Sequence, residues 1–230
     1  MKNKIIIIIS LIICFIAGIL FDKMVLNKKN DDNIENNSKI EKNDNDLEEK
    51  PITEDSRKFK EEYEKLNGTI DEFSGETYNT VNIDEDNPIE YINLEELYNV
   101  INSDENAYIY ISTPTCTYCR ASIETLLKTL KDIGVDKLYY YDISSSENSI
   151  EEQKRNEIMN KLAEQELVTL NEDGNENWSV PLIARTLSGE VLIKEVGTAI
   201  NYNEGQAKNS PLTEEQKQEL YDHYYELLKK

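Results

Sequence analysis

The sequence predicts an α/β domain with a mixed sheet and helices on both faces, preceded by a membrane anchor and a disordered tether. Three observations predict this arrangement. An apolar run opens the chain, a long polar stretch follows it, and strand-like and helix-like segments then alternate to the end. Strands that alternate with helices favour parallel pairs, whereas a tight turn at Gly189 between two strands favours an antiparallel pair.

Residues 1–26 are predicted to be a transmembrane anchor. Lys2 and Lys4 precede an apolar run over residues 5–21, which is at the lower limit of length for a helix that crosses a bilayer. An uncleaved anchor is favoured over a cleaved signal peptide because no small-residue cleavage site ends the run. Lipid attachment at Cys14 is a further alternative. The two lysines predict that the N-terminus stays inside and that the rest of the chain is extracytoplasmic.

Residues 27–55 predict a disordered acidic linker, because they are almost wholly polar and cannot bury enough apolar area to fold. Residues 56–80 form a lead-in to the domain. Within this lead-in, apolar side chains recur at i, i+4 and i+7, which predicts a short amphipathic helix over residues 56–68 that packs on the main domain.

The domain itself is predicted over residues 81–230, with the element order α-β-α-β-α-β-β-α. Apolar side chains at helical spacing and runs of β-branched and aromatic residues define its elements. Helices are expected over 93–101, 116–133, 149–168 and 213–228, and strands over 107–112, 137–143, 181–186 and 190–196. A loop or small hairpin is expected over residues 167–178, and Thr213 with Gln216 predicts a capping box at the last helix.

Charge and cysteine content exclude several classes of function. The net charge is −21, and such a surface repels phosphate backbones, so nucleic acid is not an expected partner. The chain has only three cysteines, which is too few for a disulfide-stapled scaffold. A structural metal site is not expected either, because such a site normally needs four sulfur or nitrogen ligands.

The motif Cys116-Thr117-Tyr118-Cys119 stands between a predicted strand and a predicted helix. Thr115 is expected to cap this helix and to place Cys116 at its first position. Free backbone N–H groups and the helix dipole there stabilise a thiolate and lower its pKa. Cys119 lies one turn further along, near enough to close a disulfide and more buried. Cys116 is therefore predicted to attack and Cys119 to resolve.

The segment SerThrProThrCysThrTyrCysArg, residues 112–120, resembles the active-site segment of the thioredoxin superfamily. Val180-Pro181 directly precedes a strand, as the cis-proline of that fold does, and Gly197 follows the strand pair at the usual spacing. The match covers residues 88–230. The lead-in looks like that of exported or membrane-anchored thioredoxin-like proteins of Gram-positive bacteria.

The resemblance implies a thioredoxin-like fold and a thiol–disulfide oxidoreductase that acts on cysteine-containing exported proteins. It implies no cofactor and no metal, and it adds a membrane electron donor or acceptor as a further partner. Catalysis is assigned to Cys116 and Cys119. Substrate contact is assigned to Thr117, Tyr118, Val180 and Pro181.

The chain also departs from the thioredoxin pattern. Tyr110 stands where thioredoxins carry a buried acid, so Cys119 lacks its usual proton acceptor. This departure keeps open a non-catalytic binding module on a thioredoxin-like scaffold. A third hypothesis is metal delivery, with the two thiols presenting a soft ion such as Cu(I). Oxidants, isomerases and reductants share these residues, and the reduction potential of the pair separates them.

Overall fold

A five-stranded sheet organises the computed structural model, which describes residues 51–72, 74–145, 150–207 and 209–229. The strands are β1 (Ile89–Tyr91), β2 (Ala107–Ser112), β3 (Leu138–Asp142), β6 (Leu182–Leu187) and β7 (Glu190–Val196). Their order is β1-β3-β2-β6-β7. β1 and β2 run parallel to β3, whereas β6 is antiparallel to both β2 and β7. The expectation of a mixed sheet is confirmed.

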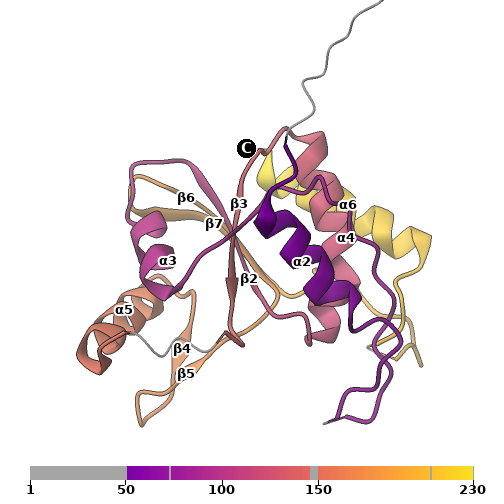
Figure 1. Cartoon of the computed structure of the whole chain (residues 1–230), viewed down its shortest axis with the longest axis horizontal. Coiled ribbons are helices and arrows are strands. Elements are labelled where there is room, and N and C mark those ends of the chain that lie inside the picture. Colours follow the sequence, from indigo (N-terminus) through magenta and orange to yellow (C-terminus); the bar gives the residue numbers. More distant parts are fainter. Residues whose placement is uncertain (1–50, 73, 146–149, 208, 230) are drawn as a thin grey trace, which may run out of the picture. The chain divides into compact units, whose positions relative to one another are not determined.

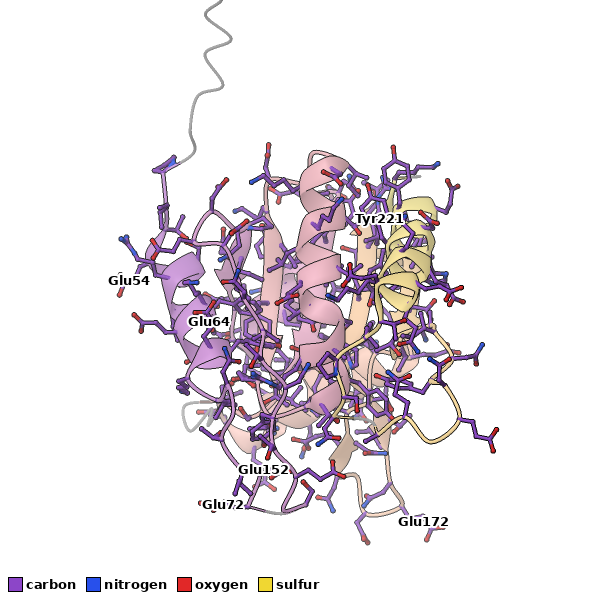
Figure 2. The ribbon with its side chains drawn as sticks, turned by 90° about the vertical axis from the view of Figure 1, so that its right-hand side faces the viewer. Glu54, Glu64, Glu72, Glu152, Glu172 and Tyr221 are labelled. Carbon is purple, nitrogen blue, oxygen red and sulfur yellow. The ribbon has the colours of Figure 1, made fainter. Side chains whose placement is uncertain are left out.

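Helices cover both faces of this sheet (Figure 1). The helices are α2 (Glu54–Glu64), α3 (Leu94–Ile101), α4 (Thr117–Asp132), α5 (Glu152–Glu164) and α6 (Glu214–Leu228). α2, α4 and α6 pack on one face, and α3 and α5 pack on the other. Figure 2 shows α4 between α2 and α6 in front of the sheet. A separate hairpin joins β4 (Thr169–Leu170) to β5 (Glu176–Asn177), as expected for this segment.

The central strand β2 shows why one sheet serves two cores. Successive side chains of a strand point to opposite faces. Ile109 and Ile111 therefore enter the core under α3 and α5, whereas Tyr110 enters the core under α2, α4 and α6. Ser112 points to the same side as Tyr110, where its hydroxyl meets Tyr63 of α2. The strand thus carries hydroxyl groups towards the helix that bears the dithiol.

Most predicted elements are present with shifts of a few residues at their ends. Asn93 and Thr213 form capping boxes that open α3 and α6. The helix expected over 149–168 is shorter, because the chain has already turned at Glu166, where φ is 58°. The edge strand β1 was not predicted, since its three residues are too few to show a period.

The lead-in is part of the domain core. α2 begins earlier than expected, at Glu54, because Thr53 and Ser56 form a capping box. Phe59 and Tyr63 of this helix are completely buried. The ring of Phe59 lies 4.9 Å from that of Tyr140 on β3, with the two rings edge to face. The predicted amphipathic helix therefore covers the sheet with its apolar face.

The anchor expected over residues 1–26 and the expected linker up to residue 50 lie outside the described residues. Residues 51–55 of that linker are described, and the last two of them, Glu54 and Asp55, belong to α2. Within the described ranges, no helix combines the length and the apolar composition needed to cross a bilayer.

Candidate functional site

The dithiol lies where β2 leads into α4. Cys116 itself is the N-cap of this helix, with φ −78° and ψ 119°, and its Sγ accepts the backbone N–H of Cys119 at 3.2 Å. Thr115, which was expected to be the cap, is exposed and lies one residue before the actual N-cap. The prediction was wrong because a sulfur atom also accepts the free N–H at the third helical position. The cap bond consequently falls on the reacting atom itself.

The two thiols have different surroundings. Cys116 is partly exposed, whereas Cys119 is fully buried, and both are free thiols. A hydrogen bond from the Cys119 thiol lowers the pKa of Cys116, and the backbone N–H groups of Cys119 and Tyr118 lower it further against the opposing effect of burial. Burial raises the pKa of Cys119 well above its ordinary value. The arrangement provides one accessible thiolate and one protected thiol.

The segment before β6 faces the accessible sulfur. The Sγ of Cys116 lies 3.8 Å from the backbone oxygen of Val180, and the Val180–Pro181 peptide bond is cis. Gly197 donates its backbone N–H to the oxygen of Pro181 at 2.8 Å, with a φ of 87° that favours glycine. This bond ties the Val180–Pro181 segment to the end of β7. The two predicted substrate-contact residues therefore lie beside the dithiol.

Thr117 and Tyr118, between the two cysteines, are both half-buried. The ring of Tyr118 meets that of Tyr202 edge to face, with centroids 5.7 Å apart. Burial raises the pKa of the Tyr202 phenol, and the negative charges of Tyr118 and of Cys116 in their ionised forms raise it further. Tyr202 is not among the predicted site residues, because it lies in an irregular segment after β7 that has no hydrophobic period.

Hydroxyl groups lie beneath the buried sulfur. The Tyr63 Oη and Ser112 Oγ atoms are 2.6 Å apart, and both residues are buried. A side-chain hydrogen bond with Ser112 lowers the pKa of Cys119, although burial outweighs it. Tyr110, at the position where thioredoxins carry an acid, is also buried. The helical period that marked Tyr63 as apolar did not indicate what its hydroxyl would contact.

Arg120 follows the dithiol and is completely buried, which no pattern in the sequence predicted. Its guanidinium group donates four hydrogen bonds, all to uncharged oxygens. The acceptors are Tyr63 O at 2.8 Å, Pro114 O at 3.2 Å, Asn67 Oδ1 at 2.6 Å and Asn79 O at 2.9 Å. Arg120 thereby joins the lead-in to the loop that carries Cys116.

Metal-ligating side chains do not form a larger cluster around this pair in the described part of the chain. No three His, Cys, Asp or Glu side chains gather there as a metal-binding group.

Comparison with known proteins gives structural neighbours only. No family model matches the chain, and no curated protein matches it. It is similar to thioredoxin from Trypanosoma brucei brucei, at 15% identity over 51% of this chain and 86% of that one, with a TM-score of 0.33. Thioredoxin from Aeropyrum pernix is 17% identical over 60% of this chain and 82% of that one, with a TM-score of 0.32. A putative oxidoreductase with a thioredoxin fold is 14% identical over 50% of this chain and 87% of that one, with a TM-score of 0.32.

The architecture itself defines the fold. β2 occupies the centre of the five strands, with the parallel strand β3 on one side and the antiparallel strand β6 on the other. The helix that follows β2 begins at the dithiol, and the segment before β6 faces it. The described domain therefore has a thioredoxin-like fold with two cysteines at the start of its central helix.

Proposed function

We propose that this protein is a thiol–disulfide oxidoreductase in which Cys116 attacks and Cys119 resolves. The observation that carries the proposal is the Cys116 sulfur at the N-cap of α4, where it accepts the N–H of Cys119 at 3.2 Å. A thiolate at a helix N-terminus is the reactive form of cysteine, whereas a buried thiol stays protonated and unreactive. Cys116 supplies the first and Cys119 the second.

The reaction balances without a cofactor. The Cys116 thiolate attacks one sulfur of a substrate disulfide, and the other substrate sulfur leaves as a thiolate that takes up a proton. The Cys119 thiol then loses its proton and attacks the Cys116 sulfur of the mixed disulfide. The second substrate thiolate leaves and is protonated. A Cys116–Cys119 disulfide remains, and the same steps in reverse oxidise a substrate dithiol.

We place the substrate beside the Val180–Pro181 segment. The half-exposed backbone of Val180 lies against the Cys116 sulfur, so an extended substrate strand that pairs with it brings its own sulfur to the dithiol. Thr117 and Tyr118 line the same opening from α4. Cysteine-containing exported proteins are the proposed substrates, and a membrane electron donor or acceptor renews the pair. The reduction potential of the pair, measured against glutathione, assigns the direction of exchange.

Trapping of the mixed disulfide tests this proposal. The Cys119→Ser variant is expected to accumulate covalent adducts with cysteine-containing exported proteins, because the thiol that would release them is gone. Non-reducing electrophoresis of cell extracts measures the adducts, and dithiothreitol should dissolve them. All variants carry Cys14→Ser, so that the third cysteine of the chain contributes no adduct.

The matched control is Cys116→Ser, which keeps the other thiol. It should form no adducts, because Cys119 is fully buried. If neither variant forms adducts under oxidising or reducing growth, the protein does not exchange disulfides, and a binding module or a metal carrier takes its place. A carrier of Cu(I) would bind the ion only when both thiols are intact, without any adducts.

We also propose that residues 1–26 anchor the chain and leave the domain extracytoplasmic. The apolar run over residues 5–21 and the lysines before it support this proposal. The native N-terminus is expected in the membrane fraction, and protease added outside intact cells should release a fragment that starts in residues 27–55. A soluble protein that begins after the apolar run would instead indicate a cleaved signal peptide.

A further inference from the structure

Side chains from four elements interact electrostatically with Cys119. Cys116 is the N-cap of α4, Tyr63 comes from α2, Tyr110 from β2 and Tyr224 from α6. The groups that act most strongly on Cys119, besides its burial, are Cys116, the backbone of Thr113 and the Ser112 hydroxyl. The resolving thiol therefore becomes nucleophilic beside hydroxyl groups that are themselves buried.

Two of these hydroxyl groups are connected. Tyr63 Oη and Ser112 Oγ lie 2.6 Å apart, and their side chains are shielded from solvent. Ser112 is the last residue of β2, and a side-chain hydrogen bond with it lowers the pKa of Cys119 against the larger effect of burial. When Tyr63 donates its proton to Ser112, the single Ser112 proton is free to point at the Cys119 sulfur. The three groups then form a chain from α2 to the resolving thiol.

We infer that Tyr63 and Ser112 stabilise the thiolate of Cys119 during resolution, with Ser112 donating to its sulfur and Tyr63 donating to Ser112. The inference rests on the proposed function and assigns positioning residues for its second step. It also gives the lead-in helix α2 a role in the redox centre, because Tyr63 lies outside the β2–α4 unit that carries the dithiol.

The pair acts as a donor and not as a base. Burial raises the pKa of Tyr63 and of Tyr110 well above the ordinary value, so these phenols stay protonated. The proton that leaves Cys119 consequently goes to the departing thiolate or to solvent. A hydroxyl donor still helps, because hydrogen bonds to an ionised acceptor are stronger than bonds between neutral groups. The hydrogen bonds from Tyr63 through Ser112 therefore stabilise the thiolate of Cys119 more than they stabilise its thiol.

Single-turnover reaction with dithiobis-nitrobenzoate separates the two steps. One equivalent of reagent reacts with Cys116 and releases the first coloured thiolate. Cys119 then attacks the mixed disulfide and releases the second. In Tyr63→Phe and Ser112→Ala the second release should slow by about fivefold or more, since Ser112→Ala loses the bond to the charged sulfur and Tyr63→Phe loses the donor that directs the Ser112 proton to it. Its pH midpoint should rise, while the first release stays within about twofold.

The matched control is Tyr91→Phe. The Tyr91 hydroxyl also bonds to α2, at Glu62 Oε2 over 2.6 Å, so its loss perturbs the docking of this helix without touching Ser112. Its second release should keep the pH midpoint of the parent chain. The Tyr63→Phe and Ser112→Ala double variant should be no slower than the slower single variant, because the two groups act in one chain. Cys14→Ser is the common background.

The outcomes separate this inference from the proposed function. If the parent chain shows both releases and the Tyr63→Phe and Ser112→Ala variants match it in rate and pH midpoint, the inference is overturned and the proposed function stands. If Tyr91→Phe shifts the midpoint as much as Tyr63→Phe, the effect is one of helix docking and the inference is again overturned. If the parent chain shows no second release, the dithiol does not resolve and the proposed function fails with it.

Discussion

Arg120→Met is expected to lower the free energy of unfolding by about 3 kcal/mol or more, since hydrogen bonds to charged groups contribute about 1.5–3 kcal/mol each. Methionine fills a similar volume and removes the cost of burying a cation. The substitution nevertheless removes the Arg120 donor from four oxygen acceptors, among them Tyr63 O and Pro114 O, although Asn67 Oδ1 keeps the N–H of Val81. The loss outweighs the gain because these acceptors belong to the backbone and to Asn67, which remain in place.

Denaturant unfolding of the reduced chain measures this effect. Lys128→Met is the matched control, because Lys128 is exposed on the same helix and its partners Asp132 and Tyr221 lie at the surface, so it should cost less than about 1 kcal/mol. Hydrogen exchange in α2 should accelerate in Arg120→Met, since the bond to Tyr63 O joins that helix to α4. An unchanged unfolding midpoint would show that the lead-in is held by its apolar contacts alone.

Cys116 is expected to react with iodoacetamide at neutral pH at least about a hundredfold faster than Cys119, because each unit of pKa separation changes the thiolate fraction about tenfold. The hydrogen bonds that Cys116 receives lower its pKa, whereas burial raises the pKa of Cys119. Since the alkylating agent must also reach the sulfur, the complete burial of Cys119 adds to the difference.

The pH profile gives the sign of each shift. The alkylation rate of Cys116 should rise with pH and level off above its lowered pKa, with a midpoint below that of an ordinary thiol. Cys119 should stay protonated and slow over the same range. Mass spectrometry of the Cys14→Ser chain, quenched at intervals, measures both rates. Equal rates for the two cysteines would contradict the assignment of attacking and resolving thiols.

The local signals in the sequence were sufficient for most of the fold. Apolar periodicity located α4 and α6, since a long amphipathic helix repeats its pattern over several turns. Runs of β-branched and aromatic residues located β2 and β7, since such residues are typical of strands. The strand β1 escaped prediction because it is short and is held in place by its pairing with β3, which is a contact between distant residues.

The candidate site likewise contains residues that the sequence predicted and residues that only the structure revealed. The Cys116–Cys119 spacing and the Val180–Pro181 dipeptide are contiguous in the chain, so they could be recognised without a structure. Tyr202 could not, because its place beside Tyr118 depends on how the segment after β7 returns to α4. The cap at Cys116 in place of Thr115 also required coordinates, since both residues have side chains that accept a hydrogen bond.

The sequence by itself determined the order of the long elements, the acidic net charge and the position of a dithiol at a helix start, because each is a property of neighbouring residues. Only the tertiary structure decided what surrounds that dithiol. Arg120 turned inward onto uncharged oxygens, and the Tyr63 hydroxyl of α2 reached Ser112 beneath the buried sulfur. Tyr63 lies far from the dithiol in sequence, and it meets Ser112 and Arg120 only because α2 and α4 pack on the same face of one sheet.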